Sequence, residues 1–328
     1  MARTDDGPTD VADDATRRLD AARTRSATDT RLPSTAHEPE NTVNRPIVVG
    51  FDGSPESLAA TDWAALEASR RRLPLELLQA WPWPKTDVLG TADAITWSRH
   101  RLGAKEATLH AELAGLEVTS AHVPHDPAEA LEAAGRGATM LVLGSRGLST
   151  LQGFLVGSVS QEVLGRATCP VVLVRVREDG PEADAQTQDV LIGLDVRQPA
   201  DDVLAFAFEA AALRSARLRA VHAWAPPVGS EYMAFAAIGG AEKELSAAAS
   251  TQLADTLTPW RTRYPQVDAR SDLVRGNAAD VVVDASATAG LVVLGRRSRR
   301  LPLGPHLGPV VHAAIHHVRC PVVIVPHH

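Results

Sequence analysis

Residues 141–160 read LVLGSRGLSTLQGFLVGSVS. The stretch begins with an apolar run of the kind that forms a buried strand, and it ends where a helix can begin. Between these elements lie four residues at a set spacing, namely Gly144, Gly147 and, after nine further residues, Gly157 and Ser158. Glycine lets backbone N–H groups come close to an anion, and a helix N-terminus presents free N–H groups to one. The stretch therefore predicts a strand, an anion-binding loop and a helix.

The same order of elements occurs twice in the chain. Strand-like runs lie at residues 47–52, 75–81, 117–123, 140–144 and 170–176, and again at 190–195, 218–224, 268–274, 291–295 and 321–326. Early landmarks such as Gly50 and Gly193 are 143 residues apart, and later ones such as Gly144 and Gly295 are 151 apart, so the second copy carries a net insertion. Short strands that alternate with Ala- and Leu-rich helical stretches are typical of the α/β class. We expect a doubly wound parallel sheet in each copy.

Composition divides the chain into four parts. Residues 1–43 are rich in Thr, Asp, Arg, Ala and Pro and show little apolar pattern, which indicates a disordered extension. A partner-binding arm that folds on contact is the alternative. Residues 44–178 and 189–328 are expected to form two domains, and the polar segment 179–188 between them, which contains a Gly-Pro pair, is expected to be the linker.

Charge and apolar patterning exclude several classes of partner. The net charge of −7 gives no basic field for nucleic acid, and no apolar run approaches the roughly 20 residues of a membrane span. Cys169 and Cys320 show no CxxC spacing, which favours a reducing cytoplasm and no redox or metal role. His312 and His316 have a helical i, i+4 spacing without an HExxH arrangement, so a metal site is not expected there either.

The second version of the opening stretch, at residues 291–310, lacks part of the pattern. Gly295 is kept, but Ser298 replaces the second glycine, and Gly308 is followed by Pro309. Proline fits the first position of a helix but brings no N–H and no hydroxyl. Two lost charge-assisted hydrogen bonds, at roughly 1.5 kcal/mol each, weaken anion binding about a hundredfold. The second copy is therefore expected to be degenerate.

Four arginines lie between residues 296 and 300 in this second version. A solvated basic loop is the simpler interpretation, and phosphate binding by an arginine fork is the alternative. The second copy also keeps Asp195 as the counterpart of Asp52, so a weaker ligand site there stays open.

The spacing resembles that of the universal stress protein family, whose nucleotide-binding members carry GxxG, nine residues and then Gly-Ser or Gly-Thr. The resemblance extends to Asp52 in GFDGS, to the Pro-Ala of DPAEAL and to the closing CPVVLV, and it covers residues 46–176 and 188–326. It implies two tandem domains, each with a five-stranded parallel sheet in the order 3-2-1-4-5. It also implies that the final strands pair the two copies as an intramolecular pseudo-dimer, and that tandem chains associate as a homodimer.

The resemblance further implies an adenine nucleotide as the ligand: ATP, with ADP or AMP as alternatives and Mg²⁺ as a companion. The residues that it assigns to the nucleotide are Asp52, Ala80, Leu143, Gly144, Gly147, Gly157 and Ser158. Two of them also have a purely structural interpretation. Asp52 would be a loop residue before a helix that starts at Ser54 and Pro55, and Ser158 would be an early residue of its own helix.

Three functions are compatible with these patterns. The favoured one is an ATP-binding stress-response regulator in which the first copy holds the nucleotide. The second is an enzyme with slow ATPase or nucleotidyl-transfer activity, which we disfavour because the loop offers no general base beyond Asp52. The third is an interaction module that binds no ligand. We therefore expect a non-enzymatic protein with no catalytic residues.

Overall fold

The computed structural model describes residues 44–81, 91–147, 154–155, 157–176, 189–225, 235–298 and 307–328. The predicted N-terminal extension, the predicted linker and residues 148–153 of the glycine motif lie outside these ranges. The predicted domain limits therefore stay a prediction, and the two copies are called the first and second repeat below.

Each repeat has the strands that the alternating pattern predicts. Those of the first repeat are β1 (Ile47–Gly50), β2 (Leu75–Ala80), β3 (Val118–Val123), β4 (Met140–Gly147) and β6 (Val171–Arg175), with the two-residue β5 (Phe154–Leu155) paired to the end of β4. Those of the second repeat are β7 (Val190–Gly193), β8 (Leu218–Trp224), β9 (Ala269–Arg275), β10 (Leu291–Arg297) and β11 (Val322–His327).

Helices connect these strands. The first repeat contains α2 (Pro55–Arg71), α3 (Thr91–Glu112), α4 (Pro127–Gly135) and α5 (Ser158–Arg166). The second contains α6 (Asp201–Arg214), α7 (Phe235–Arg263), α8 (Ala278–Ala285), the short 3₁₀ helix η3 (Ser286–Thr288) and α9 (Pro309–His317). Among the described residues, none of the helices combines the length and the apolar character that crossing a membrane requires.

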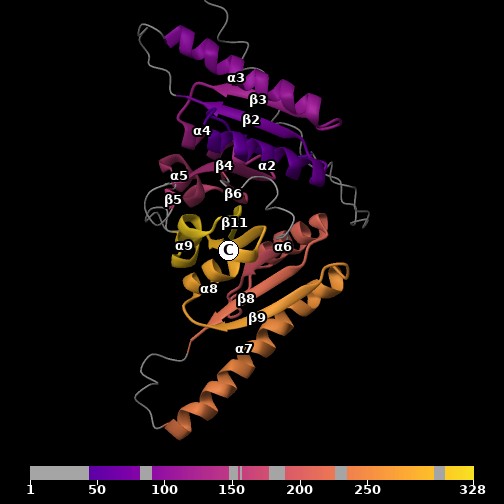
Figure 1. The fold of residues 1–328 in the computed structure, drawn as a ribbon, viewed down its shortest axis with the longest axis vertical. Helices are drawn as coiled ribbons and strands as arrows, with labels where there is room; N and C mark the ends of the chain where they lie inside the picture. The colour runs from indigo at the N-terminus through magenta and orange to yellow at the C-terminus, as the bar shows by residue number, and fades with distance from the viewer. Residues whose placement is uncertain are drawn as a thin grey trace, which may run out of the picture. The chain divides into compact units, whose positions relative to one another are not determined.

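The strand order agrees with the predicted topology in both repeats (Figure 1). The first repeat runs β3-β2-β1-β4-β6 and the second β9-β8-β7-β10-β11, with parallel neighbours throughout. The two halves join through β6 and β11, which pair antiparallel with Val172 opposite Val323. The predicted order 3-2-1-4-5 is confirmed, and the final strands of the two repeats pair within the chain.

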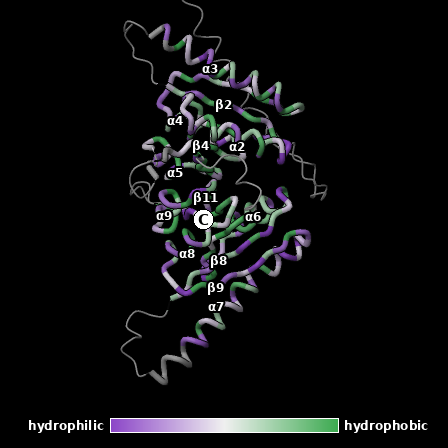
Figure 2. The backbone as a smooth tube through the Cα atoms, in the orientation of Figure 1, coloured by the Kyte–Doolittle hydropathy of each residue, from purple (hydrophilic) through white to green (hydrophobic). Residues whose placement is uncertain are grey.

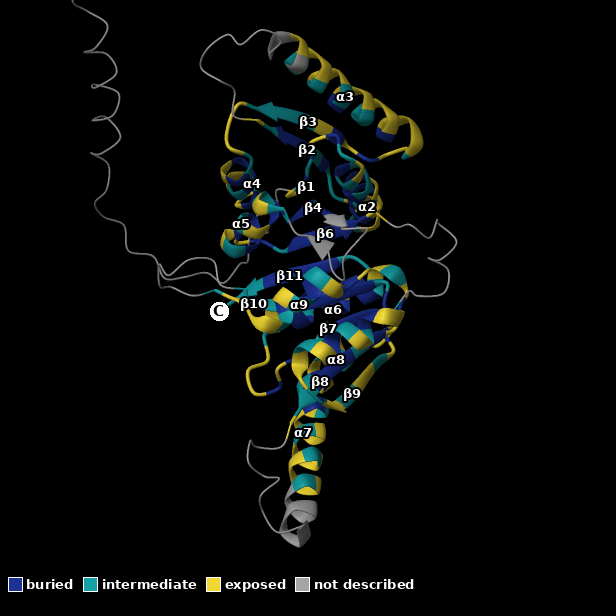
Figure 3. Cartoon of the chain, turned by 60° about the vertical axis from the view of Figure 1, so that its left-hand side comes forward, coloured by how far each residue is buried: buried dark blue, intermediate teal, exposed yellow. Residues whose placement is uncertain are grey.

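The core has one layer on each face of the sheet, and each layer contains residues of both repeats. Alternate residues of the joining strands point to opposite layers: Val172 and Val323 to one, Leu173 and Val322 to the other. Figure 3 shows buried residues concentrated in the central strands and exposed residues on the outer faces of the helices. In α3 and α7 hydrophobic and hydrophilic residues alternate (Figure 2), because each helix lays only one side on the sheet.

An ion cluster joins α2 to α6 across the two repeats. The buried carboxylate of Glu67 lies 2.6 Å from Nε of Arg71 and 2.5 Å from Nη2 of Arg214. The Arg71 guanidinium lies over the ring of Phe206, 5.0 Å from its centroid, and that of Arg214 over the ring of Trp63, at 6.0 Å. Both the arginines and the aromatic residues are repeat counterparts, 143 residues apart. The arginines and rings are therefore symmetric, but the carboxylates are not: Glu67 bridges both arginines, and the half-exposed Glu209 lies 3.1 Å from Nη1 of Arg71.

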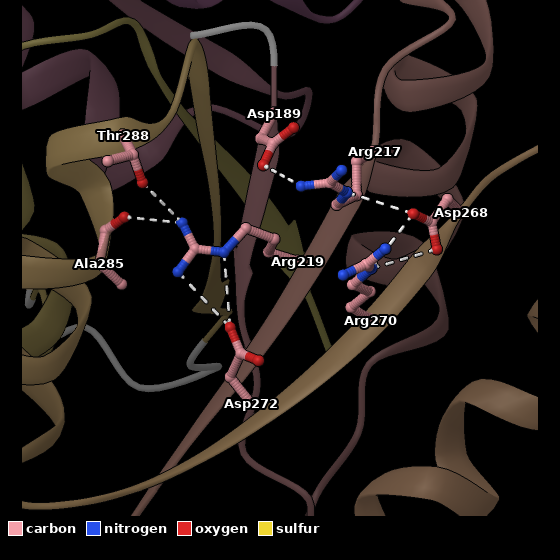
Figure 4. A network of polar contacts seen from close by, with 8 residues as sticks. All are labelled: Asp189, Arg217, Arg219, Asp268, Arg270, Asp272, Ala285 and Thr288. Atoms are coloured by element: carbon pink, nitrogen blue, oxygen red, sulfur yellow. Dashed lines mark hydrogen bonds and ion pairs between the residues drawn. The ribbon is translucent and has the colours of Figure 1, made fainter.

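The edge strand β9 is bordered by paired charges (Figure 4). Arg217 lies 3.6 Å from Asp189 and 3.2 Å from Asp268, while Arg219 lies 3.4 Å from Asp272. Such partly exposed pairs each contribute little to stability. Charged side chains on an edge strand do, however, oppose its pairing with a second chain.

Candidate nucleotide site

Five of the seven residues that the resemblance assigns to a nucleotide lie from the middle of parallel strands to just past their carboxyl ends, the side where α/β sheets bind ligands. The other two, Gly157 and Ser158, begin α5. Asp52 follows β1 and is exposed, and its Oδ1 accepts hydrogen bonds from N–H (2.9 Å) and Oγ (2.5 Å) of Ser54. Ser54 in turn caps α2, because its Oγ accepts from the N–H of Ser57 at 3.2 Å. These hydrogen bonds agree with the interpretation of Asp52 as a loop residue before a helix. Its contact with a nucleotide stays a prediction.

Ala80 and Leu143 would meet a ligand mainly through their backbones. β1 ends at Gly50, opposite Leu78, so Ala80 at the end of β2 reaches two residues past it. The Leu143 side chain is buried and lies over Gly50, 2.9 Å from the position that a Cβ would take there. Contact of these two residues with a nucleotide stays a prediction.

Gly144 has a packing role that the sequence did not indicate. A Cβ added to it would lie 2.6 Å from the carbonyl carbon of Glu56 and 2.8 Å from the backbone nitrogen of Ser57. Both atoms belong to the first turn of α2, so β4 approaches this helix only because Gly144 has no side chain. The counterpart Gly295 is different, because its added Cβ would meet the ring of His327, at 2.8 Å from Nε2.

Alanine at these two glycines should therefore have unequal effects on stability. We expect Gly144→Ala to lower the free energy of unfolding by about 2 kcal/mol, because a helix backbone must move. Gly295→Ala should lower it by about 1 kcal/mol or less, because a side-chain ring can rotate away. Urea denaturation of both variants measures the difference. Equal losses would show that the α2 backbone moves away from an added methyl group as easily as the His327 ring does.

The second half of the motif forms an open helix N-terminus. Gly147 ends β4, and its backbone pairs with Phe154 of β5, which turns the chain back toward α5. Gly157 is the N-cap of α5, with φ −61° and ψ 154°, and the cap has no side-chain hydrogen bond. A Cβ at Gly157 would meet nothing within 4 Å, and Ser158 beside it is exposed. This helix end can accept an anion.

A cavity of about 680 Å³ lies at the equivalent place in the second repeat. It is bounded by the ends of β7, β8 and β10 and by the N-termini of α8 and α9. Counterparts of six of the seven assigned residues line it, namely Asp195, Ala223, Leu294, Gly295, Gly308 and Pro309. The structure thus brings the equivalents of the assigned set together around one space.

The start of α6 explains much of the room in this cavity. α6 begins at Asp201, the counterpart of Leu58, whereas α2 begins at Pro55, three residues earlier in the repeat. The chain before α6 instead forms a turn in which the N–H of Gln198 donates to the carbonyl of Asp195 at 3.1 Å. The cavity was not predicted from the sequence, where its local signal is the loss of the Ser-Pro helix start in the second repeat.

Polar side chains line this cavity, and two of them differ from the first repeat: His222 and His327 stand where it has Gln79 and Val176, whereas Arg297 corresponds to Arg146. Nδ1 of His222 lies 2.9 Å from the carbonyl oxygen of Leu194 and therefore donates to it, since a carbonyl oxygen can only accept. Arg297 donates to the side chain of Gln198, and His327 also faces the cavity. Arg297 belongs to the basic run after Gly295 for which phosphate binding was the alternative interpretation. His222 and His327 were not singled out for a ligand, because only the fold brings them to the cavity.

The interpretation of the arginines after Gly295 as a solvated loop is wrong for Arg296. Its side chain is buried, and it bonds to carbonyl oxygens of Gly165 and Ala167 in the first repeat. The reason is that β10 continues to Arg297 and carries Arg296 toward the other repeat. The last two of the four arginines lie outside the described residues.

A metal centre finds no support in the described part of the chain. His312 and His316 lie on α9 with ring centroids 4.6 Å apart. Within the described ranges, no group of three or more His, Cys, Asp or Glu side chains is placed to hold a metal ion. The two histidine rings are accounted for by their contact with each other.

Comparison with known proteins identifies the family. The model of the universal stress protein family matches residues 44–175 and again 186–326. The chain belongs to the universal stress protein family. Universal stress protein Rv2005c of Mycobacterium tuberculosis is 34% identical over 298 residues, which cover 85% of this chain and 96% of that protein. Rv2623 of the same organism is 32% identical over 297 residues, covering 85% and 95%.

A solved structure confirms the fold of this universal stress protein. The crystal structure of a universal stress protein from Archaeoglobus fulgidus matches with a TM-score of 0.62 and 15% identity, covering 87% of this chain and 99% of that one. At this identity the likeness concerns the fold alone. The chain is thus a universal stress protein with two repeats of the family fold.

Proposed function

We propose that this universal stress protein is a nucleotide-binding regulator that holds ATP in its first repeat. One observation carries the proposal: counterparts of six of the seven assigned residues line a single cavity in the second repeat. Since the two repeats share strand order, and since α5 and α9 begin at equivalent positions, this supports a common crevice for Asp52, Ala80, Leu143, Gly144, Gly147, Gly157 and Ser158. The phosphates would lie at the open N-terminus of α5, and the base at the end of β2.

The proposal also assigns unequal roles to the repeats. The second repeat has a roomy cavity but begins α9 with Pro309, which offers neither an N–H nor a hydroxyl to a phosphate. It would therefore serve mainly as a structural partner of the first repeat. ADP or AMP would compete for the same site, and Mg²⁺ would arrive with the nucleotide. We treat the protein as a binder rather than an enzyme, because the carboxylate of Asp52 is hydrogen-bonded to Ser54.

Location and partners complete the proposal. We infer a cytoplasmic protein, which reduced Cys169 and Cys320 outside any disulfide suit, with neither nucleic acid nor membrane as a partner. Association of two tandem chains into a dimer is part of the same proposal.

The nucleotide itself provides the first test. Freshly purified full-length protein, denatured and examined by mass spectrometry, should release an adenine nucleotide, and calorimetric titration of the emptied protein with ATP should give close to one site per chain. GTP serves as the control for base selection. Absence of any nucleotide together with no heat on ATP addition would overturn the proposed function, and an ATP-independent interaction module would remain.

A further inference from the structure

The helices that begin at the two motif positions, α5 and α9, each end against an arginine from the other repeat. Arg296 of β10 donates to the carbonyl oxygens of Gly165 (3.1 Å) and Ala167 (2.5 Å) at the end of α5. Arg175 of β6 donates to the carbonyl oxygens of Ile315 (2.5 Å) and Val318 at the end of α9. Each of these helices is therefore held at its C-terminus across the junction between the repeats.

One acceptor of each pair is related by the repeat, but the donors are not. Ala167 and Val318 are counterparts, 151 residues apart. The counterpart of Arg296 is Ser145, and that of Arg175 is Pro326, so the same contact is made from β10 in one case and from β6 in the other. The two contacts are therefore not copies of one arginine. We explain them by the effect that a cation has at the C-terminus of a helix.

A guanidinium at this place acts on the whole helix. The last carbonyls of a helix have no intrahelical partner and carry the negative end of its dipole, which a cation stabilises. Arg296 and Arg175 are 9% and 5% exposed, so solvent and salt screen their charges little. Burial lowers the pKa of Arg296, and it lowers that of Arg175 to about 10, which leaves a guanidinium charged at neutral pH.

The other end of α5 is the proposed phosphate site. α5 has nine residues, so about 13 Å of helix separates the guanidinium of Arg296 from Gly157 and Ser158. Val163 and Leu164 pack α5 into the core, and Arg296 ties its C-terminal end to β10 of the other repeat with two hydrogen bonds. The cation at one end and an anion at the other both complement the same helix dipole.

We propose that Arg296, a residue of the second repeat, is a positioning residue for the nucleotide site of the first repeat, acting through α5. This rests on the proposed function, since it assumes that ATP phosphate binds at the α5 N-terminus. The second repeat is then more than a structural neighbour, because it supplies a charge on which the affinity of the first repeat depends. Arg175 does the same for α9 and so should have little influence on ATP in the first repeat.

The matched pair Arg296→Met and Arg175→Met tests this in the full-length chain. Both substitutions keep a long apolar stem and remove a buried guanidinium from a helix C-terminus. Calorimetric titration with ATP should give Arg296→Met a dissociation constant roughly fivefold to tenfold above wild type, and Arg175→Met a value within about twofold of it. Arg296→Lys, which restores the charge, should recover most of the loss. Melting temperatures of both methionine variants should fall by similar amounts.

The outcomes separate this inference from the proposed function. No ATP binding by the wild type would overturn the proposed function. ATP binding by the wild type with equal affinities for the two methionine variants would overturn the role of Arg296 alone. If Arg296→Met does not fold, the same comparison is made between Arg296→Lys and Arg175→Lys. We expect the affinity for ATP to fall about twofold to threefold in Arg296→Lys and to stay unchanged in Arg175→Lys. Equal affinities there would again contradict the proposal.

Discussion

Replacing Glu67 with alanine is expected to lower the free energy of unfolding by about 3–5 kcal/mol, the usual effect of removing one partner from a buried ion cluster. Arg71 and Arg214 both bond to this carboxylate and are 5% and 13% exposed at their side chains. The substitution therefore removes the carboxylate from the buried Arg214 and leaves Arg71 with the half-exposed Glu209, 3.1 Å from its Nη1. Urea denaturation is the appropriate measurement, because guanidinium salts would screen the cluster. A loss below about 1 kcal/mol would show that water reaches the arginines in the variant.

The same carboxylate predicts that the free energy of unfolding decreases at acidic pH. Burial alone would raise the pKa of Glu67, but the charges and hydrogen bonds of Arg214 and Arg71 outweigh it and hold the pKa below its ordinary value of 4.5. A group whose folded-state pKa is depressed contributes fully above its unfolded pKa and loses that contribution as pH falls through the folded value. Wild-type stability should therefore decline below about pH 4.5, more steeply than that of Glu67→Ala.

The repeat supplies a matched control for the cluster. Ala210 of α6 is the counterpart of Glu67 and is fully buried, whereas the two arginines are counterparts of each other. The double variant Glu67→Ala with Ala210→Glu moves the carboxylate to the equivalent place on the other helix. It should regain more than half of the stability that Glu67→Ala loses. A double variant no more stable than the single one would show that only α2 can present the carboxylate.

The fold could be predicted because its signals are local and occur twice. Alternating apolar runs and helical stretches predict a parallel sheet, and the two offsets of 143 and 151 residues place every strand of one repeat on a strand of the other. The order 3-2-1-4-5 came from the family resemblance, and the structure has it in both repeats. The joining of β6 to β11 was also expected from the family resemblance, and it covers two short apolar strands that would otherwise be exposed at sheet edges.

The features that the sequence did not indicate all depend on contacts between distant positions. Glu67 looks like an ordinary helical residue, and Arg296 looks like part of a basic loop, until α6 and α5 are brought beside them. Gly144 was interpreted through a ligand, although the first turn of α2 already requires its missing side chain. Periodicity and spacing describe single elements, so they cannot state which element from the other repeat will arrive at a given face.

The asymmetry between the repeats leads to the prediction with the largest effect on binding. Ser158→Pro should weaken ATP binding about a hundredfold, because it removes one N–H and one hydroxyl from the proposed phosphate site. The substitution suits the helix: Gly157 has φ −61° and ψ 154°, and Gly308, which precedes Pro309 at the same place in the second repeat, has φ −63° and ψ 161°. Proline at this position therefore fits the existing backbone. Calorimetric titration with ATP measures the loss.

The reverse substitution, Pro309→Ser, is the reciprocal control. It returns an N–H and a hydroxyl to the start of α9, beside a cavity of about 680 Å³, and should raise the affinity of the second repeat for ATP by up to about a hundredfold. Titration of this variant should approach two sites per chain, whereas the wild type gives one and Ser158→Pro gives none at the same concentrations. If Ser158→Pro binds ATP as the wild type does, the nucleotide is not held at α5. If the wild type already fills two equal sites, Pro309 does not limit the second repeat.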